Sequence, residues 1–198
     1  LAEEHFRMAI EIDPQSPEAF IGLASLLLSR GDTDEAFANF QNAYEVAPNA
    51  DRANAGLAMI YLDRGDLAHA VEHFRQAFSP PGGHTAPTLT GTKWAAVAER
   101  YARLLATCSQ EEYRDGQQAL EFAQKAVANT NARSIRCLDT LAAAYAELGE
   151  YENAVQAIQQ AIELANLSVQ PGQLPVLNDH LELYQRNEPL REDPTLRR

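Results

Sequence analysis

Apolar residues recur with helical spacing along most of the chain, in pairs of segments joined by short polar turns. The first clear segment carries apolar residues on one face: Phe20, Leu23, Ala24 and Leu27. A Gly-Asp turn follows at 31–32, after which a second segment resumes the same spacing. Pro48 closes this unit, because proline ends a helix and restricts the residue before it. The pattern predicts helix-turn-helix hairpins.

The hairpin recurs with a period of 34 residues. Alanines and phenylalanines return at this interval, as Ala2, Ala36 and Ala70, as Phe6, Phe40 and Phe74, and as Ala9, Ala43 and Ala77. Small alanines let two helices approach closely, and the phenylalanine fills the space beside them. A fixed period of this length is typical of proteins in which similar helical units stack on one another.

The repeat resembles the tetratricopeptide repeat, and the resemblance covers most of the chain. The clearest copy lies at 138–165 and matches the family pattern at Leu138, Leu141, Ala142, Tyr145, Gly149, Ala154, Ile158 and Ala161. The resemblance implies an all-α fold, an α-α superhelix (solenoid) of about four full helical hairpins with a leading half-repeat and a C-terminal capping helix. From Leu104 onward the sequence is similar to the C-terminal repeat array of larger bacterial proteins of this family.

We expect a single solenoid domain over residues 1–198. Its predicted parts are a half-repeat at 1–14, repeats at 17–50, 51–81, 93–133 and 135–168, an insert at 82–92, a capping helix at 172–186 and a tail at 187–198. The repeat at 93–133 has a long hairpin loop. The half-repeat lacks a first helix, so we expect either more repeats upstream of Leu1 or a contact over its apolar face.

The charge and composition of the chain restrict its partners. A net charge of −12 repels nucleic acid and anionic lipid surfaces, so we expect no nucleic-acid partner. No apolar run approaches the length of a membrane span, and the N-terminus lacks the layout of a signal peptide. We expect a soluble chain with no direct membrane insertion. The compartment stays open between the cytoplasm, which is slightly favoured, and the periplasm.

One short motif resembles the zinc-binding order H-x-x-E-H of some metalloproteases. His69, Glu72 and His73 supply it, but Ala70 and Phe74 of the same helix take the packing positions of the repeat. We therefore expect both histidines on the solvated outer face; the alternative is a weak metal site that includes His84. We expect no catalytic residue, no resident metal, no cofactor and no enzymatic activity.

The resemblance implies a scaffold for protein-protein interaction, because in the family the first helix of each hairpin lines the concave groove. Candidate peptide-binding residues on these helices are Arg52, Met59, Leu62, Arg100, Arg103, Arg136 and Asp139, with Met59 and Leu62 expected to be exposed. Arginine grips carboxylates with two parallel hydrogen bonds, and methionine adapts to apolar side chains. We therefore expect an extended or helical peptide with an acidic group and one or two apolar anchors.

Three alternatives to this binding role stay open. In the first, the arginines pair with carboxylates of neighbouring helices, namely Glu99, Asp139, Asp63 and Glu147. In the second, the array is the regulatory or substrate-presenting region of a larger bacterial enzyme, for example a glycosyltransferase-like protein. In the third, it is a homo-oligomerisation module that associates through the uncovered face of 1–13 or through the insert near Trp94.

Overall fold

The structure is a computed structural model that describes residues 1–78, 90–168 and 171–193. Within these ranges the regular structure is helical, with no strand, as the sequence predicts. The chain divides into two compact units, 1–89 and 90–198, where the sequence predicts one domain. The boundary falls in the predicted insert, whose residues 82–89, including His84, lie outside the described residues.

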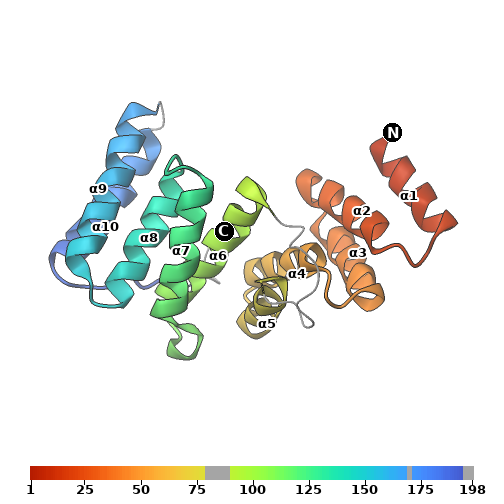
Figure 1. The fold of residues 1–198 in the computed structure, drawn as a ribbon, viewed down its shortest axis with the longest axis horizontal. Coiled ribbons are helices and arrows are strands. Elements are labelled where there is room, and N and C mark those ends of the chain that lie inside the picture. Colours follow the sequence, from red (N-terminus) through yellow and green to blue (C-terminus); the bar gives the residue numbers. More distant parts are fainter. Residues whose placement is uncertain (79–89, 169–170, 194–198) are drawn as a thin grey trace. The chain divides into compact units, whose positions relative to one another are not determined.

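The first unit contains a leading helix and two hairpins (Figure 1). Its helices are α1 (Ala2–Ile12), α2 (Pro17–Arg30), α3 (Thr33–Val46), α4 (Asp51–Asp63) and α5 (Leu67–Phe78). The side chain of Ser16 caps the N-terminus of α2, and Pro17 occupies its first turn, where a missing N–H has no cost. Gly31 ends α2 in the left-handed conformation (φ 91°), which turns the chain into α3.

The second unit contains two hairpins followed by one more helix (Figure 1). Its elements are α6 (Gly91–Thr107), η1 (Glu111–Tyr113), α7 (Gly116–Asn129), α8 (Ile135–Glu147), α9 (Tyr151–Leu167), η2 (Pro171–Gln173) and α10 (Leu174–Gln185). Helix α10 packs on α9, and its Leu177 and Tyr184 are buried with Leu138 and Ile158 in one apolar core. It therefore covers the last hairpin as a cap.

Successive hairpins of the first unit meet where a phenylalanine lies against a glycine. The Phe6 ring of α1 lies against Gly22 of α2, and the Phe40 ring of α3 lies against Gly56 of α4. A Cβ on Gly56 would lie 2.5 Å from Cζ of Phe40, so only glycine admits the ring at this distance. Both contacts follow the 34-residue period and show how the repeat couples neighbouring hairpins.

Helix α1 has no first helix of its own repeat beside it in the described residues, and part of its apolar surface is exposed. Met8 is 49% exposed and Ile12 is 84% exposed. Phe6 and Ile10 pack against the core of the first unit instead. The exposed residues lie in the half-repeat whose face the sequence predicts to be uncovered.

The contact between Phe40 and Gly56 generates a stability prediction. The substitution Gly56→Ala should lower the free energy of unfolding of the first unit by about 1 to 3 kcal/mol, because the added methyl group overpacks a buried ring. Gly172→Ala is the matched control, since a Cβ at Gly172 meets open space. Urea denaturation of both variants measures the difference, and equal stability of the two would contradict this account of the contact.

Candidate functional site

A buried ionic network lies at the centre of the second unit, around Arg103 of α6. Arg103 is only 8% exposed, and its guanidinium is shared between two carboxylates. Nη1 donates to Oδ2 of Asp139 on α8 at 2.6 Å. Nε donates to Oε2 of Glu192 at 2.9 Å, and Nη2 donates to Oε1 of Glu192 at 2.7 Å. The pairing with Glu192 is the bidentate form that makes arginine specific for carboxylates.

The second oxygen of Asp139 connects the network to α10. Nδ1 of the buried His180 lies 2.7 Å from Oδ1 of Asp139. Burial raises the pKa of the Asp139 carboxyl, but the charge of Arg103 and the hydrogen bond with His180 outweigh it, so the pKa lies below its usual value. Asp139 is therefore a carboxylate at neutral pH, and it holds Arg103 in place from the side opposite to Glu192.

Glu192 reaches this network because the chain turns back after α10. Asn187, with φ 57°, ends the helix, and the following residues return to the C-terminal end of α6. The N–H of Glu192 donates to the carbonyl of Thr107 at 2.8 Å, and the N–H of Ser109 donates to the carbonyl of Glu192 at 2.9 Å. The Thr107 hydroxyl also donates to Oε2 of Glu192 at 3.0 Å. The segment is thus held by its backbone as well as its carboxylate.

The two residues before Glu192 are also held by the second unit. Leu190 is buried in the same apolar core as Leu177 and Tyr184. Nη1 of Arg191 lies 2.6 Å from Oε2 of Glu147 at the end of α8. Residues 190–192 therefore place an apolar, a basic and an acidic side chain in turn against the core, α8 and α6.

A second pair on the same two helices involves predicted site residues. Arg136 of α8 pairs with Glu99 of α6, whose other oxygen accepts a hydrogen bond from the Thr140 hydroxyl at 2.9 Å. The alternative of internal ion pairing is confirmed for Arg103 with Asp139 and for Arg136 with Glu99. Arg100 is half-buried on α6.

The other two carboxylates predicted as partners of these arginines, Glu147 and Asp63, lie in different surroundings. Glu147 pairs with Arg191 and with Arg114, whose Nε donates to Oε1 of Glu147 at 3.0 Å. Asp63 is exposed on the last turn of α4. Two predicted residues, Arg103 and Asp139, thus belong to the buried network, and a third, the exposed Arg136, forms a separate pair with Glu99 on the same two helices.

The remaining predicted residues lie on α4 in the first unit. Arg52 and Met59 are half-buried, seven residues apart on one side of the helix. Leu62 is only 6% exposed, so the expectation that it is exposed was wrong. The reason is that α4 packs against α2, α3 and α5, and these neighbours cover more of its surface than a single packing stripe predicts.

The two histidines of the H-x-x-E-H motif differ in their surroundings. His69 is exposed, and its Nδ1 lies 2.7 Å from Oδ2 of Asp66. His73 is 8% exposed, with Nδ1 2.8 Å from Oδ1 of Asn54 and its ring stacked on Tyr61. The expectation that both are solvated was wrong for His73, because its side of α5 is covered by α4. Among the described residues no group of His, Cys, Asp and Glu could hold a metal.

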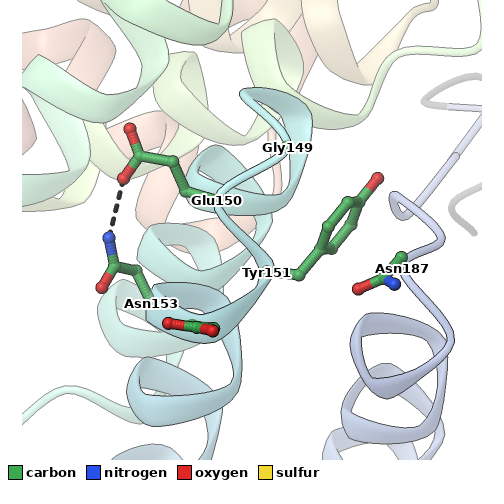
Figure 2. A pocket seen from close by; sticks show the side chains of 6 residues that line it. Gly149, Glu150, Tyr151, Asn153 and Asn187 are labelled. Atoms are coloured by element: carbon green, nitrogen blue, oxygen red, sulfur yellow. Dashed lines mark hydrogen bonds between the residues drawn. The ribbon is translucent and has the colours of Figure 1, made fainter.

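An open depression lies at the turn between α8 and α9 (Figure 2). It has a volume of about 590 Å³, and its lining residues are Gly149, Glu150, Tyr151, Glu152, Asn153 and Asn187. Figure 2 shows Tyr151, from α9, and Asn187, from beyond α10, among the side chains that line it, and the hydrogen bond that Asn153 donates to Glu150 measures 2.8 Å. Its polar side chains are exposed or half-buried, which makes it a surface feature beside the returning segment rather than an enclosed site.

Both cysteines are buried and free. Burial raises the pKa of the Cys108 thiol and that of the Cys137 thiol, so the reactive thiolate is disfavoured at each. In the part of the chain that the structure describes, no helix combines the length and apolar character needed to cross a membrane.

The sequence did not identify Glu192, Leu190 or His180 as parts of the site. The one available signal was the apolar residue Leu190 within the mostly polar stretch NEPLRED at 187–193. Such a residue indicates a segment that folds back onto a core.

The buried position of Arg103 predicts a large effect of its removal. Arg103→Gln should lower the free energy of unfolding by about 3 to 5 kcal/mol, because Asp139 and Glu192 lose their buried cation. Arg186→Gln is the control, since its pair with Glu188 is solvent-exposed and should change stability by less than about 1 kcal/mol. Denaturation by guanidinium chloride measures the free energy of unfolding of both variants. Equal losses of stability in the two would contradict the network.

The buried position of His73 predicts a pH effect. Burial, helped by the charge of His69, lowers the pKa of His73 below the usual 6.5 despite the opposing effect of Glu72. The unfolded chain therefore binds this proton at higher pH, and the free energy of unfolding falls as the pH drops below about 6.5. His73→Leu should reduce that slope in urea denaturation, whereas the exposed control His5→Gln should keep it. Identical slopes in parent and His73→Leu would refute the prediction.

Comparisons with known proteins agree with this architecture. Family models described as tetratricopeptide repeat match residues 21–84 and 135–166. No curated protein sequence matches the chain significantly.

Three solved structures illustrate the similarity of fold. YrrB, a TPR protein with an unusual peptide-binding site, shares 20% identity and a TM-score of 0.69 over 98% of this chain and 88% of that one. PilF of Pseudomonas aeruginosa shares 18% identity with a TM-score of 0.54, over 86% of this chain and 76% of PilF. MamA from Desulfovibrio magneticus shares 17% identity with a TM-score of 0.54, over 86% of this chain and 90% of the MamA chain.

The predicted fold class, an all-α tetratricopeptide solenoid, is confirmed by these likenesses and by the helices of the structure. The 34-residue period, the hairpins it produces and the two matched family models lead to the same assignment. The chain belongs to the tetratricopeptide repeat family.

Proposed function

We propose that this chain is a non-catalytic scaffold that binds an extended segment of a partner protein. The bound segment lies on the first helices of the hairpins and carries an acidic group beside one or two apolar residues. The tetratricopeptide fold is a protein-interaction fold, and YrrB is described as having a peptide-binding site. Stacked hairpins suit this role because they present an extended surface built from repeated helices.

One observation carries the proposal. In the second unit the first helices α6 and α8 already bind an extended segment, residues 190–192 of the chain itself. The segment uses main-chain hydrogen bonds for affinity and side chains for specificity, as extended peptides commonly do. Its carboxylate takes the bidentate arginine contact expected of an acidic ligand.

The first unit presents a related combination of side chains on its own first helices. Arg52 and Met59 lie on α4, and Leu28 is exposed near the end of α2. Helices α2 and α4 contact each other, so these groups belong to neighbouring elements. An arginine beside methionine and leucine suits a carboxylate next to an aliphatic side chain.

Two alternatives from the sequence stay predictions. One is a regulatory or substrate-presenting region of a larger enzyme, and the other is a homo-oligomerisation module. The exposed Met8 and Ile12 of α1 are compatible with either, because an uncovered apolar face needs a neighbour from the same or another chain.

Selection of displayed peptides on the purified chain tests the proposal. It should enrich segments with a carboxylate close to an aliphatic residue. Arg52→Glu should weaken a selected peptide that binds the first unit by at least about tenfold, or about 1.4 kcal/mol, because it reverses the charge that meets the carboxylate. Arg75→Glu, on the exposed side of α5, is the control and should leave affinity unchanged. No enrichment, or equal affinity for both variants, would exclude this site.

A further inference from the structure

The segment 190–192 occupies a site whose other components are held without it. Arg103 is fixed by Asp139, and Asp139 is fixed in turn by His180. These three residues come from α6, α8 and α10. Helices α8 and α10 share one apolar core with α9, and α6 packs against α7 and α8. Removing Glu192 would therefore leave Nε and Nη2 of a buried guanidinium facing an empty position, with Thr107 beside them. Such a position favours another carboxylate.

The segment is joined to α10 by a short exposed connection. Arg186, Asn187 and Glu188 are exposed, and their main-chain hydrogen bonds return to the last turn of α10. Leu190 is the first residue after α10 that is buried in the core of the second unit. The bound part is therefore as short as a peptide ligand, and α10 keeps its own C-terminal hydrogen bonds whether or not that part is in place.

Each residue of the segment meets a group of matching chemistry. Leu190 enters the apolar core, Arg191 pairs with Glu147, and Glu192 pairs with Arg103. Exchanging the basic and the acidic residue would place like charges together at both ionic positions, at a cost in affinity. The contacts therefore match a sequence in the order apolar, basic, acidic.

We propose that residues 190–192 are a built-in competitor, which occupies in cis a recognition site on α6 and α8 for a partner segment of the same apolar-basic-acidic order. The partner gains access by displacing the segment. This proposal rests on the proposed function and adds to it the chemistry of the partner and an autoinhibitory contact.

Tethering determines how strong the competition is. A segment joined by a short connection acts at an effective concentration on the order of mM. A free peptide of the same sequence, with a micromolar intrinsic Kd, is therefore expected to bind the intact chain at least about tenfold more weakly than a chain whose own segment is impaired. Weak ligands therefore do not displace the tethered segment, whereas ligands of high affinity or high concentration do.

The test uses a fluorescent peptide with the sequence of residues 187–193, NEPLRED, and the full chain. The double variant Leu190→Ala, Glu192→Gln weakens the hold of the cis segment and should bind the peptide at least about tenfold more tightly than the parent in fluorescence anisotropy. Glu188→Gln, in the exposed connection, is the control and should bind like the parent. The peptide carrying Glu192→Gln should bind the double variant at least about tenfold more weakly.

A truncation after Glu188 supplies an independent arm, with circular dichroism and thermal denaturation as checks on its fold. If the truncated chain or the double variant is folded but does not bind the peptide, the proposal is wrong. If the peptide binds the parent and the double variant with equal affinity, the cis segment does not compete with it. A concentration-dependent dimer of the parent that the peptide dissociates would assign the segment to a second copy and overturn the cis contact. A selected ligand that still depends on Arg52 would, in each case, leave the proposed function standing.

Discussion

A buried guanidinium must be matched by carboxylates, and this constraint organises the second unit. Arg103 lies between Asp139 on α8 and Glu192 beyond α10, so a single side chain links a first helix, the next first helix and the segment after the cap. The charge cannot be left unpaired without a cost of several kcal/mol. The position of the returning segment therefore follows from the chemistry of α6 as much as from the apolar contact of Leu190.

The same constraint relates stability to recognition. Groups that bind an extended acidic segment also complete the fold when that segment belongs to the chain itself. The ion pairs that could be taken as alternatives to ligand binding are thus parts of one arrangement, in which Arg103 meets both a permanent partner, Asp139, and a replaceable one, Glu192. The first unit differs in that its candidate residues Arg52 and Met59 are half-buried on a single helix, α4.

The repeat made most of the helices predictable. Alanines and phenylalanines at a fixed period mark the surfaces where helices touch, and the apolar spacing of Leu177 and Tyr184 predicted the cap α10. Periodicity describes one packing stripe, however, and not the second neighbour of a helix. For this reason Leu62 and His73 were wrongly predicted to be exposed, since α4 and α5 are covered on more than one side. Glu192 belongs to no repeat, so no spacing could bring it to a residue so far away in the sequence.

The central claim is that Arg103 and Glu192 are coupled in the folded chain. A double-mutant cycle of Arg103→Gln and Glu192→Gln, followed by the free energy of unfolding, measures this coupling directly. The account predicts an interaction energy of at least about 1 kcal/mol, because each single change leaves a buried charge without its partner. Additivity of the two changes within about 0.3 kcal/mol would contradict it.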